Sequence, residues 1–264
     1  MPIGLSDAVF DAESAGHAFL GDLAGRYSAI SYRSAAAVLG TRAPEEAEAI
    51  RRVLGGFTIS EDEIRRPGGN RMSATIRFGE LAAAAGFFTE VHIEADLDVR
   101  LWSGLGAGAH KIGDLKRPDY IHNHMIDFWR GRVAVDYEWN SKDQTYDRDL
   151  YALRSFFEAG VIDVGVIVTR DLPKSYLKGL GRALNKDGTE AASTVAEKLG
   201  ASTTGMDKLL SRIAAGRSGG CPVLAIGIRE GSVTAAAGPA AAGPAAAEEP
   251  SGPEDEDAQP GLFD

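Results

Sequence analysis

Residues 126–150, IDFWRGRVAVDYEWNSKDQTYDRDL, combine the pattern of a buried β-hairpin with the densest group of polar side chains in the chain. Within this stretch, residues 133–138 (VAVDYE) alternate strictly, as expected for a strand whose successive side chains point to opposite faces of a sheet. Val133, Val135 and Tyr137 share one face, and Ala134, Asp136 and Glu138 share the other. One face is therefore expected to enter a core, while the other carries two acidic side chains.

A third acidic side chain comes from the strand before the turn. If the turn occupies residues 130 and 131, Asp127 falls opposite Ala134. It is then a diagonal neighbour of Asp136 on the same face, within about 7–8 Å. Like charges at this distance repel unless a cation lies among them. A divalent metal is the simplest interpretation, because Mg²⁺ is commonly held by one or two carboxylates with waters and phosphate oxygens.

The segments around the hairpin indicate the fold class. Apolar residues recur at helical spacing in residues 143–160, which end at Gly160. The β-branched run 161–170 is typical of a strand buried on both faces. Residues 87–102 alternate like a half-exposed strand, and apolar positions in 6–24 and 44–54 have helical spacing. The order of elements predicts an α/β (α+β) fold with a mixed central sheet flanked by helices.

The hairpin, IDFWRGRVAVDYE, resembles the active-site hairpin of the BglII-like type II restriction endonucleases. In that family Ile-Asp-Phe is followed, about nine residues after the Asp, by Glu-x-Gln, and the related BamHI pattern closes with Glu-x-Glu. Both are variants of the PD-(D/E)xK nuclease fold. The likeness covers roughly residues 110–170 and extends more faintly to 200–210 and 221–228. It implies a restriction-endonuclease-like catalytic and DNA-binding domain over residues 1–230.

The resemblance also implies roles for the three acidic residues. By position, Asp127 matches the first metal ligand, Asp136 the second, and Glu138 the place where most of the superfamily has Lys. Two departures leave the general base open: Asp136 replaces the usual Glu, and Glu138 cannot supply a positive charge. Glu138 would orient or deprotonate the attacking water, or bind a second ion, with one or two Mg²⁺ per site. Asp119, in a Pro-Asp pair, is the alternative to Asp127.

Side chains for DNA contact are expected in the segments that border the hairpin. Polar residues leave the catalytic strand directly, and Lys, Arg, Ser and Thr recur in the two segments 170–186 and 202–217. The candidates are Asn140, Ser141, Lys142, Gln144, Lys174, Lys178, Arg182, Ser202, Thr203, Thr204 and Lys208. A charged, solvated helix face is the alternative interpretation of the two later segments.

Composition bounds the setting of the protein. The 264 residues contain no run of about 20 apolar residues and no basic-then-apolar N-terminal segment, which predicts a cytoplasmic, bacterial protein without membrane contact. The single cysteine, Cys221, lies in an apolar run and is expected to be buried. Seven acidic residues and no basic residue lie from Gly231 onward, so residues 1–230 carry a formal charge of −3 out of −10. Such a body can hold a basic surface for DNA.

Residues 231–264 are expected to be a disordered tail. Ala/Gly/Pro repeats followed by an acidic block cannot bury enough apolar surface to offset the entropy of ordering. The last six residues, QPGLFD, resemble the short peptide by which many bacterial proteins bind the DNA sliding clamp. An incidental apolar end is the alternative.

The sequence therefore predicts a Mg²⁺-dependent, sequence-specific endonuclease that cuts double-stranded DNA, a type II restriction enzyme acting as a homodimer on a palindromic site. Two alternatives stay open. One is a repair or structure-specific nuclease of the same fold, and the other is a catalytically silent DNA-binding or clamp-associated adaptor.

Overall fold

The computed structural model describes residues 9–68, 72–200 and 202–235, apart from the side chains of His122 and Asn123. The predicted tail from residue 236 onward, with its QPGLFD end, lies outside the described residues. No helix in the described ranges is long and apolar enough to cross a membrane.

The first half of the chain forms helices, two separate short strands and a long hairpin. Its elements are α1 (Glu13–Leu20), η1 (Gly21–Gly25), β1 (Tyr27–Tyr32), α2 (Ala35–Arg42), α3 (Pro44–Gly56), β2 (Ile59–Ser60), α4 (Glu61–Arg65), α5 (Ser73–Ala84), β3 (Phe88–Ser103), η2 (Gly106–Gly108) and β4 (His110–Arg130). The half-exposed strand predicted at 87–102 is β3, and the helix predicted at 44–54 is α3, with Pro44 in its first turn.

The second half alternates strands and helices. Its elements are β5 (Val133–Glu138), α6 (Thr145–Glu158), β6 (Val164–Arg170), α7 (Lys174–Gly179), β7 (Arg182–Leu184), β8 (Glu190–Thr194), α8 (Val195–Lys198), α9 (Met206–Ala214), β9 (Val223–Ile228), η3 (Glu230–Ser232) and β10 (Val233–Thr234). The predicted hairpin strand, helix and buried strand are β5, α6 and β6.

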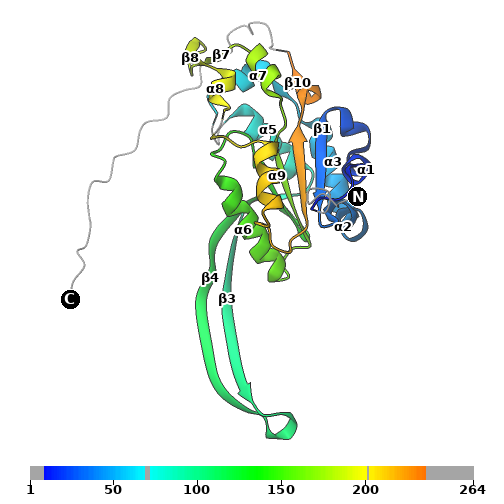
Figure 1. Ribbon diagram of the computed structural model, residues 1–264, viewed down its shortest axis with the longest axis vertical. Coiled ribbons are helices and arrows are strands. Elements are labelled where there is room, and N and C mark those ends of the chain that lie inside the picture. The colour runs from blue at the N-terminus through cyan, green and yellow to red at the C-terminus, as the bar shows by residue number, and fades with distance from the viewer. Residues whose placement is uncertain (1–8, 69–71, 201, 236–264) are drawn as a thin grey trace, which may run out of the picture.

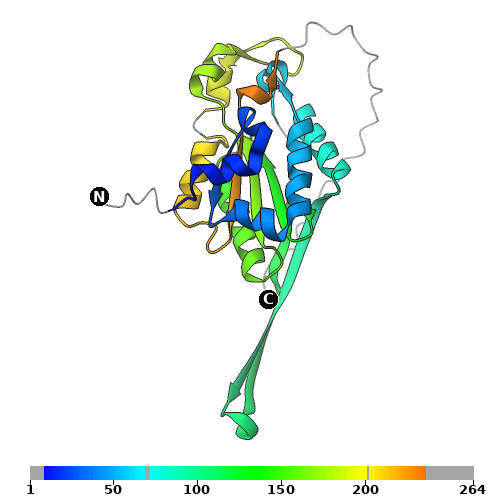
Figure 2. The same cartoon turned by 90° about the vertical axis from the view of Figure 1, so that its right-hand side faces the viewer.

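A six-stranded mixed sheet organises the molecule, with strand order β1-β9-β6-β5-β4-β3. β5, β6 and β9 run parallel, and the remaining neighbours pair antiparallel. Every residue of β6 is buried, which confirms that this strand lies between two covered faces. The predicted mixed sheet flanked by helices is confirmed (Figures 1 and 2).

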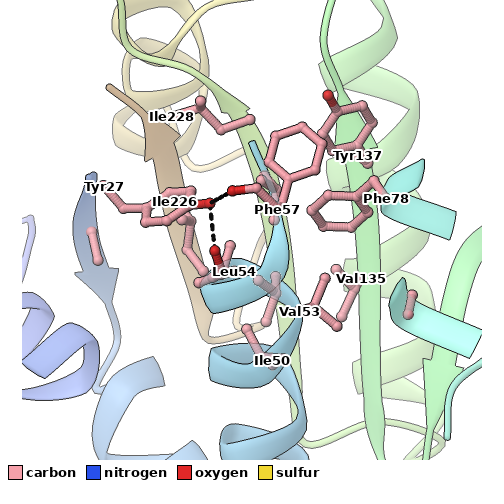
Figure 3. Close-up of a cluster of buried hydrophobic side chains, with 14 of the residues drawn as sticks. Tyr27, Ile50, Val53, Leu54, Phe57, Phe78, Val135, Tyr137, Ile226 and Ile228 are labelled. Carbon is pink, nitrogen blue, oxygen red and sulfur yellow. Dashed lines mark hydrogen bonds between the residues drawn. The ribbon is translucent and has the colours of Figure 1, made fainter. Parts of the chain in front are cut away.

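Two apolar cores cover the two faces of the sheet. Phe57 of the α3 end, Phe78 of α5 and Tyr137 of β5 pack ring to ring on one face, with Phe78 and Tyr137 stacked at 4.4 Å between centroids (Figure 3). The Tyr27 hydroxyl donates to the Leu54 carbonyl at 2.7 Å on the same side. α6 and α9 cover the opposite face, where Cys221 is buried as predicted.

β5 divides its side chains between these cores as the alternation predicts. Val133, Val135 and Tyr137 belong to the first core, and Ala134 belongs to the second. Asp136 and Glu138 therefore point toward the layer formed by α6. Both are buried, at 4% and 7% exposed, although they are acidic.

The β4–β5 register differs from the predicted one. Arg130 pairs with Val133 and Phe128 with Val135, so the turn occupies residues 131 and 132 rather than 130 and 131. Gly131, at φ +54°, stands first in the turn, where a two-residue hairpin of type II′ requires a positive φ. The pairing moves by two residues, which preserves the faces but brings Asp127 opposite Asp136 instead of Ala134.

β3 and β4 continue beyond the sheet as a long two-stranded arm. Both views show it projecting from the body far past the helices (Figures 1 and 2). It is held by antiparallel pairing from Phe88↔Trp129 to Ser103↔His110, with shifts of register on the way. We call residues 94–119 the arm, because these residues lie outside the two cores.

The folded body extends past the predicted boundary at residue 230. Val233 pairs with Ile59 in a parallel β10–β2 ladder, and Ser232 is buried with its hydroxyl donating to the Arg26 carbonyl at 2.9 Å. Residues 231–235 are therefore part of the fold and not of a tail. The sequence did not predict this extension, because the stretch is too short to show a periodic pattern.

Candidate active site

Hydrogen bonds between β4 and β5 hold Asp127 and Asp136 next to each other. The Asp127 backbone N–H donates to Asp136 Oδ1 at 3.2 Å, and the Tyr137 N–H donates to Asp127 Oδ2 at 2.9 Å. Each carboxylate thus accepts a hydrogen bond from the backbone of the opposite strand. The two predicted metal ligands are fixed side by side by the sheet itself.

Glu138 ends β5 and is held from the neighbouring strand. The Thr169 hydroxyl on β6 donates to the Glu138 carbonyl at 2.7 Å and lies 2.7 Å from the Tyr146 hydroxyl of α6. Because Asp136 and Glu138 are two residues apart on one strand, they share the face toward α6. The Asp127 and Glu138 charges both act on Asp136.

α6 adds a fourth carboxylate that the sequence analysis missed. Asp149 is only 2% exposed and pairs through Oδ1 with Arg148 at 3.0 Å. Helical spacing was the available signal, since Asp149 lies on the same helix face as the core residues Leu153 and Phe156. An acidic residue at a core position of an amphipathic helix needs a partner.

The four carboxylates shift one another's protonation. Burial, followed by the Asp149 and Asp127 charges, raises the pKa of Asp136 well above its usual range. Burial and the Asp149 charge raise the pKa of Glu138 to about 7, against a hydrogen bond from Ser141. Burial also raises the pKa of Asp149 to about 6, although Arg148 acts in the opposite direction. The site strongly resists holding all four negative charges.

Three of the carboxylates each have a buried oxygen without a hydrogen-bond partner. Asp136 Oδ2, Glu138 Oε2 and Asp149 Oδ2 are buried and have no hydrogen-bond partner. Buried acceptors without partners are costly, and a hard cation with oxygen ligands would satisfy them. Within the described residues, no three His, Cys, Asp or Glu side chains already stand close enough to hold a metal ion. The arrangement fits Mg²⁺ held by one or two carboxylates and completed by water and phosphate oxygens.

Two of the predicted DNA-contact segments lie side by side at this end of β5. Lys142 forms a β-bridge with Thr203, the Thr204 N–H donates to the Ser141 carbonyl at 2.9 Å, and the Asp143 N–H donates to the Ser202 carbonyl at 3.0 Å. Lys142, Gln144 and Ser202 are exposed, while Asn140 and Ser141 are half-buried.

Other predicted contacts face inward. Thr204 is fully buried, and the Lys208 ammonium donates to the carbonyls of Gly200 and Thr203. The Thr203 hydroxyl accepts from buried Arg170 at 2.6 Å. These three side chains hold the loop together instead of projecting from it, because a loop with many backbone carbonyls needs internal donors.

The remaining basic candidates lie elsewhere. Lys174, Lys178 and Arg182 are exposed on α7 and β7, at the end of the molecule opposite the arm (Figure 1). The alternative acid Asp119 is exposed on the arm, eight positions before Asp127 along β4. The structure therefore groups Asp127 with Asp136, and it does not group Asp119 with them.

Comparisons with known proteins give a family for the chain. The family described as "Restriction endonuclease BglII/BglIII" matches residues 27–228, from the first residue of β1 to the last residue of β9. No curated protein matches the chain. Among solved structures, "Crystal structure of restriction endonuclease BGLII complexed with DNA 16-mer" matches with a TM-score of 0.45 and 9% identity, covering 78% of this chain and 77% of that chain.

Proposed function

Because this chain belongs to the BglII/BglIII restriction endonuclease family, we propose that it is a type II, Mg²⁺-dependent enzyme that cuts double-stranded DNA at a specific sequence. The observation that carries the proposal is the group of buried, unpartnered carboxylate oxygens at the end of β5. A solvated strand face would not bury the oxygens of Asp136 and Glu138 against a third one from Asp149 on α6, whereas a metal-dependent phosphodiesterase uses such oxygens.

Asp127 and Asp136 would hold the ion, as their fixed backbone hydrogen bonds favour one orientation for each carboxylate. Bound Mg²⁺ supplies charge neutralisation at the phosphate and acidifies a bound water. Asp149 lies close enough to raise the pKa of Asp136 and would serve as a further oxygen ligand or orient a water.

Glu138 is the group best suited to take a proton. A general base works best when its pKa lies near the working pH, and the pKa of Glu138 is about 7. Its unpartnered Oε2 gives the attacking water an acceptor. This assignment makes a Lys at this position unnecessary for proton transfer.

DNA would lie across the exposed loops beside the site. Lys142, Gln144 and Ser202 present donors to phosphates or base edges, and Arg148, 66% exposed beside the buried acids, would meet the phosphate that is cut. A homodimer on a palindromic sequence would place one such site on each strand.

Incubating the protein with a long, unmodified duplex and Mg²⁺ tests the proposal, with EDTA as the control. Discrete fragments that disappear in EDTA are expected. A smear or nicks at structured positions would instead identify a repair or structure-specific nuclease. Intact DNA with a gel shift would identify a binding protein without catalysis.

A further inference from the structure

Two loops beside the carboxylate site are joined to each other. We call residues 139–144 the first loop, and residues 199–200 and 202–205 the second loop. Their backbones meet at the β-bridge between Lys142 and Thr203. Both loops carry exposed side chains that are candidates for DNA contact. The position of one loop relative to the other therefore decides whether these side chains can meet a duplex together.

A single side chain from β6 reaches both loops. Arg170 Nη1 donates to the Trp139 carbonyl of the first loop at 3.1 Å. Arg170 Nη2 donates to the Leu199 carbonyl at 2.9 Å and to the Thr203 hydroxyl at 2.6 Å, and both acceptors belong to the second loop. A guanidinium can hold acceptors on two sides at once, because its five donors are spread around a rigid plane.

Arg170 is also a buried cation. The residue is only 6% exposed, and its side-chain hydrogen bonds within the described part of the chain all go to uncharged oxygens. Burial lowers the pKa of Arg170 to about 10, and the opposing effects of Tyr146 and Asp207 are smaller. Burying a cation without an ion-pair partner is costly, so we expect Arg170 to do something that an apolar side chain at this position could not.

The same region of β6 fixes the first loop to the catalytic strand. Thr169 donates to the carbonyl of Glu138 at 2.7 Å, and its neighbour Arg170 donates to the next carbonyl, that of Trp139. The first loop therefore leaves the carboxylate site in a direction set by β6. Since Arg170 also binds the second loop, the positions of both loops are set relative to Glu138.

The charge around the second loop suits a phosphate-bearing partner. Burial, followed by the Arg170 charge, lowers the pKa of Lys198 to about 8. Burial also lowers the pKa of Lys208, where the Asp143 charge acts in the opposite direction and the Arg170 charge in the same one. The Lys208 ammonium donates to the Gly200 carbonyl at 3.1 Å. Three cations thus lie beside this loop, and a DNA backbone is complementary to them.

We propose that Arg170 is a positioning residue for DNA binding, which holds the two loops as one unit at the end of β5 so that Lys142, Gln144 and Ser202 meet the duplex together. It acts through the loops and not by contact with the DNA. Its role in DNA binding rests on the proposed function, whereas the coupling of the two loops does not.

Hydrogen exchange in the free protein tests the coupling. Thr203→Val removes the hydroxyl that Arg170 binds while it preserves the shape of the side chain. The amides of Thr204 and Asp143, which donate from one loop to the other, should exchange at least about 10-fold faster. Thr189→Val, in the exposed turn between β7 and β8, is the matched control and should leave both amides unchanged. Faster exchange confined to the second loop, or no change, overturns the coupling.

DNA binding without cleavage tests the positioning role. In EDTA, Thr203→Val and Arg170→Lys should each bind a labelled mixed-sequence duplex about 10-fold more weakly. The slope of log affinity against log salt should fall by about 0.9, as expected when one phosphate contact such as that of Lys142 is lost. Mg²⁺ binding measured by calorimetry should stay unchanged in Thr203→Val, because the four carboxylates lie outside both loops, and a general loss of structure would weaken it.

The possible results separate this role from the proposed function. Normal DNA affinity and salt slope in a folded Thr203→Val protein whose loops exchange faster overturn the positioning role of Arg170. A parent chain that binds no duplex overturns the proposed function itself, and the exchange measurement then still decides whether Arg170 couples the loops.

Discussion

The two halves of β4 place the same strand in opposite environments. From Ile126 to Arg130 it lies between β3 and β5, beneath the helices, and carries Asp127 into the carboxylate site. From His110 to about residue 120 it has β3 as its one strand partner and projects into solvent. The first half donates from Asp127 N–H to Asp136, a buried carboxylate whose other oxygen has no hydrogen-bond partner. The second half exposes apolar side chains such as Ile112 and Leu115.

A buried group of carboxylates and an exposed apolar strand are both unfavourable for stability, but they predict different effects of mutation. Removing a charge from the buried site should relieve repulsion and stabilise the metal-free protein while it abolishes chemistry. Removing apolar surface from the arm should leave the stability of the protein nearly unchanged, because residues 94–119 lie outside both cores. The predictions below test whether stability and function separate in these two ways.

Asp136→Asn should have the largest effect. The substitution preserves shape but removes one charge from a carboxylate that is only 4% exposed. Cleavage should fall at least about 10²-fold, because a group acting on the transition state is lost. DNA binding should persist, and the melting temperature in EDTA should rise. A destabilised variant that still cuts at the normal rate would assign Asp136 a structural role only.

Asp149→Asn should reduce cleavage by about 10- to 100-fold, as expected for a group that supports or completes a metal site. Mg²⁺ titration by calorimetry should show weaker binding in the same variant, a result that loss of a merely structural residue would not give. Asp147→Asn is the control on the same helix, since Asp147 pairs with Arg212 at 3.2 Å instead of facing the site. Equal losses of cleavage activity in the two variants would show that Asp149 is not part of the site.

Glu138 predicts the pH dependence of stability. The pKa of its carboxyl is about 7 in the folded protein and 4.5 ordinarily. Between these two pH values the native state therefore holds a proton that the unfolded chain has lost. The resulting stabilisation is fully present below about pH 4.5 and is lost as pH rises through about 7, and it amounts to roughly 3 kcal/mol in unfolding free energy. The melting temperature measured in EDTA should fall as the pH rises over this range. Glu138→Gln should flatten this dependence, and an unchanged slope would contradict the assignment.

The faces of β5 could be predicted from the sequence, but the hairpin register could not. Alternation with period two fixes which side chains share a face, and a shift of two residues leaves that pattern intact. The position of the turn decides the register. Gly131 suits the first turn position, but sequence alone allowed a turn at 130 and 131 equally well.

Asp149 and the arm show two further limits of sequence reasoning. A carboxylate on a core face of α6 is visible in the helical period, yet which neighbour it meets depends on how α6 packs on the sheet. The strand of residues 87–102 was predicted, but its return strand was not, because Gly residues and Pro118 interrupt the pattern of residues 104–120. Non-local pairing supplied both features.

Chain truncation should separate the fold from the tail. We expect that ending the chain after Ala235 leaves melting temperature and cleavage unchanged, since composition gives the remaining residues no apolar face for a core. Ending it after Glu230 should cost about 1–2 kcal/mol, because the buried Ser232 hydrogen bond and the β10–β2 pairing are lost. Equal melting temperatures for the two truncations would place the true boundary at residue 230.

The smallest effect on stability is expected for an exposed apolar residue of the arm. Leu115 on the arm and Leu153 on α6 are both leucines, but Leu115 is half exposed and Leu153 is fully buried. Leu115→Ala should change the unfolding free energy by less than about 0.5 kcal/mol. Leu153→Ala should cost about 2–5 kcal/mol, because it leaves a cavity in the core. Chemical denaturation of the two variants measures both values. A large loss from Leu115→Ala would mean that the arm folds back to stabilise its own subunit, and the contrast between the two halves of β4 would then fail.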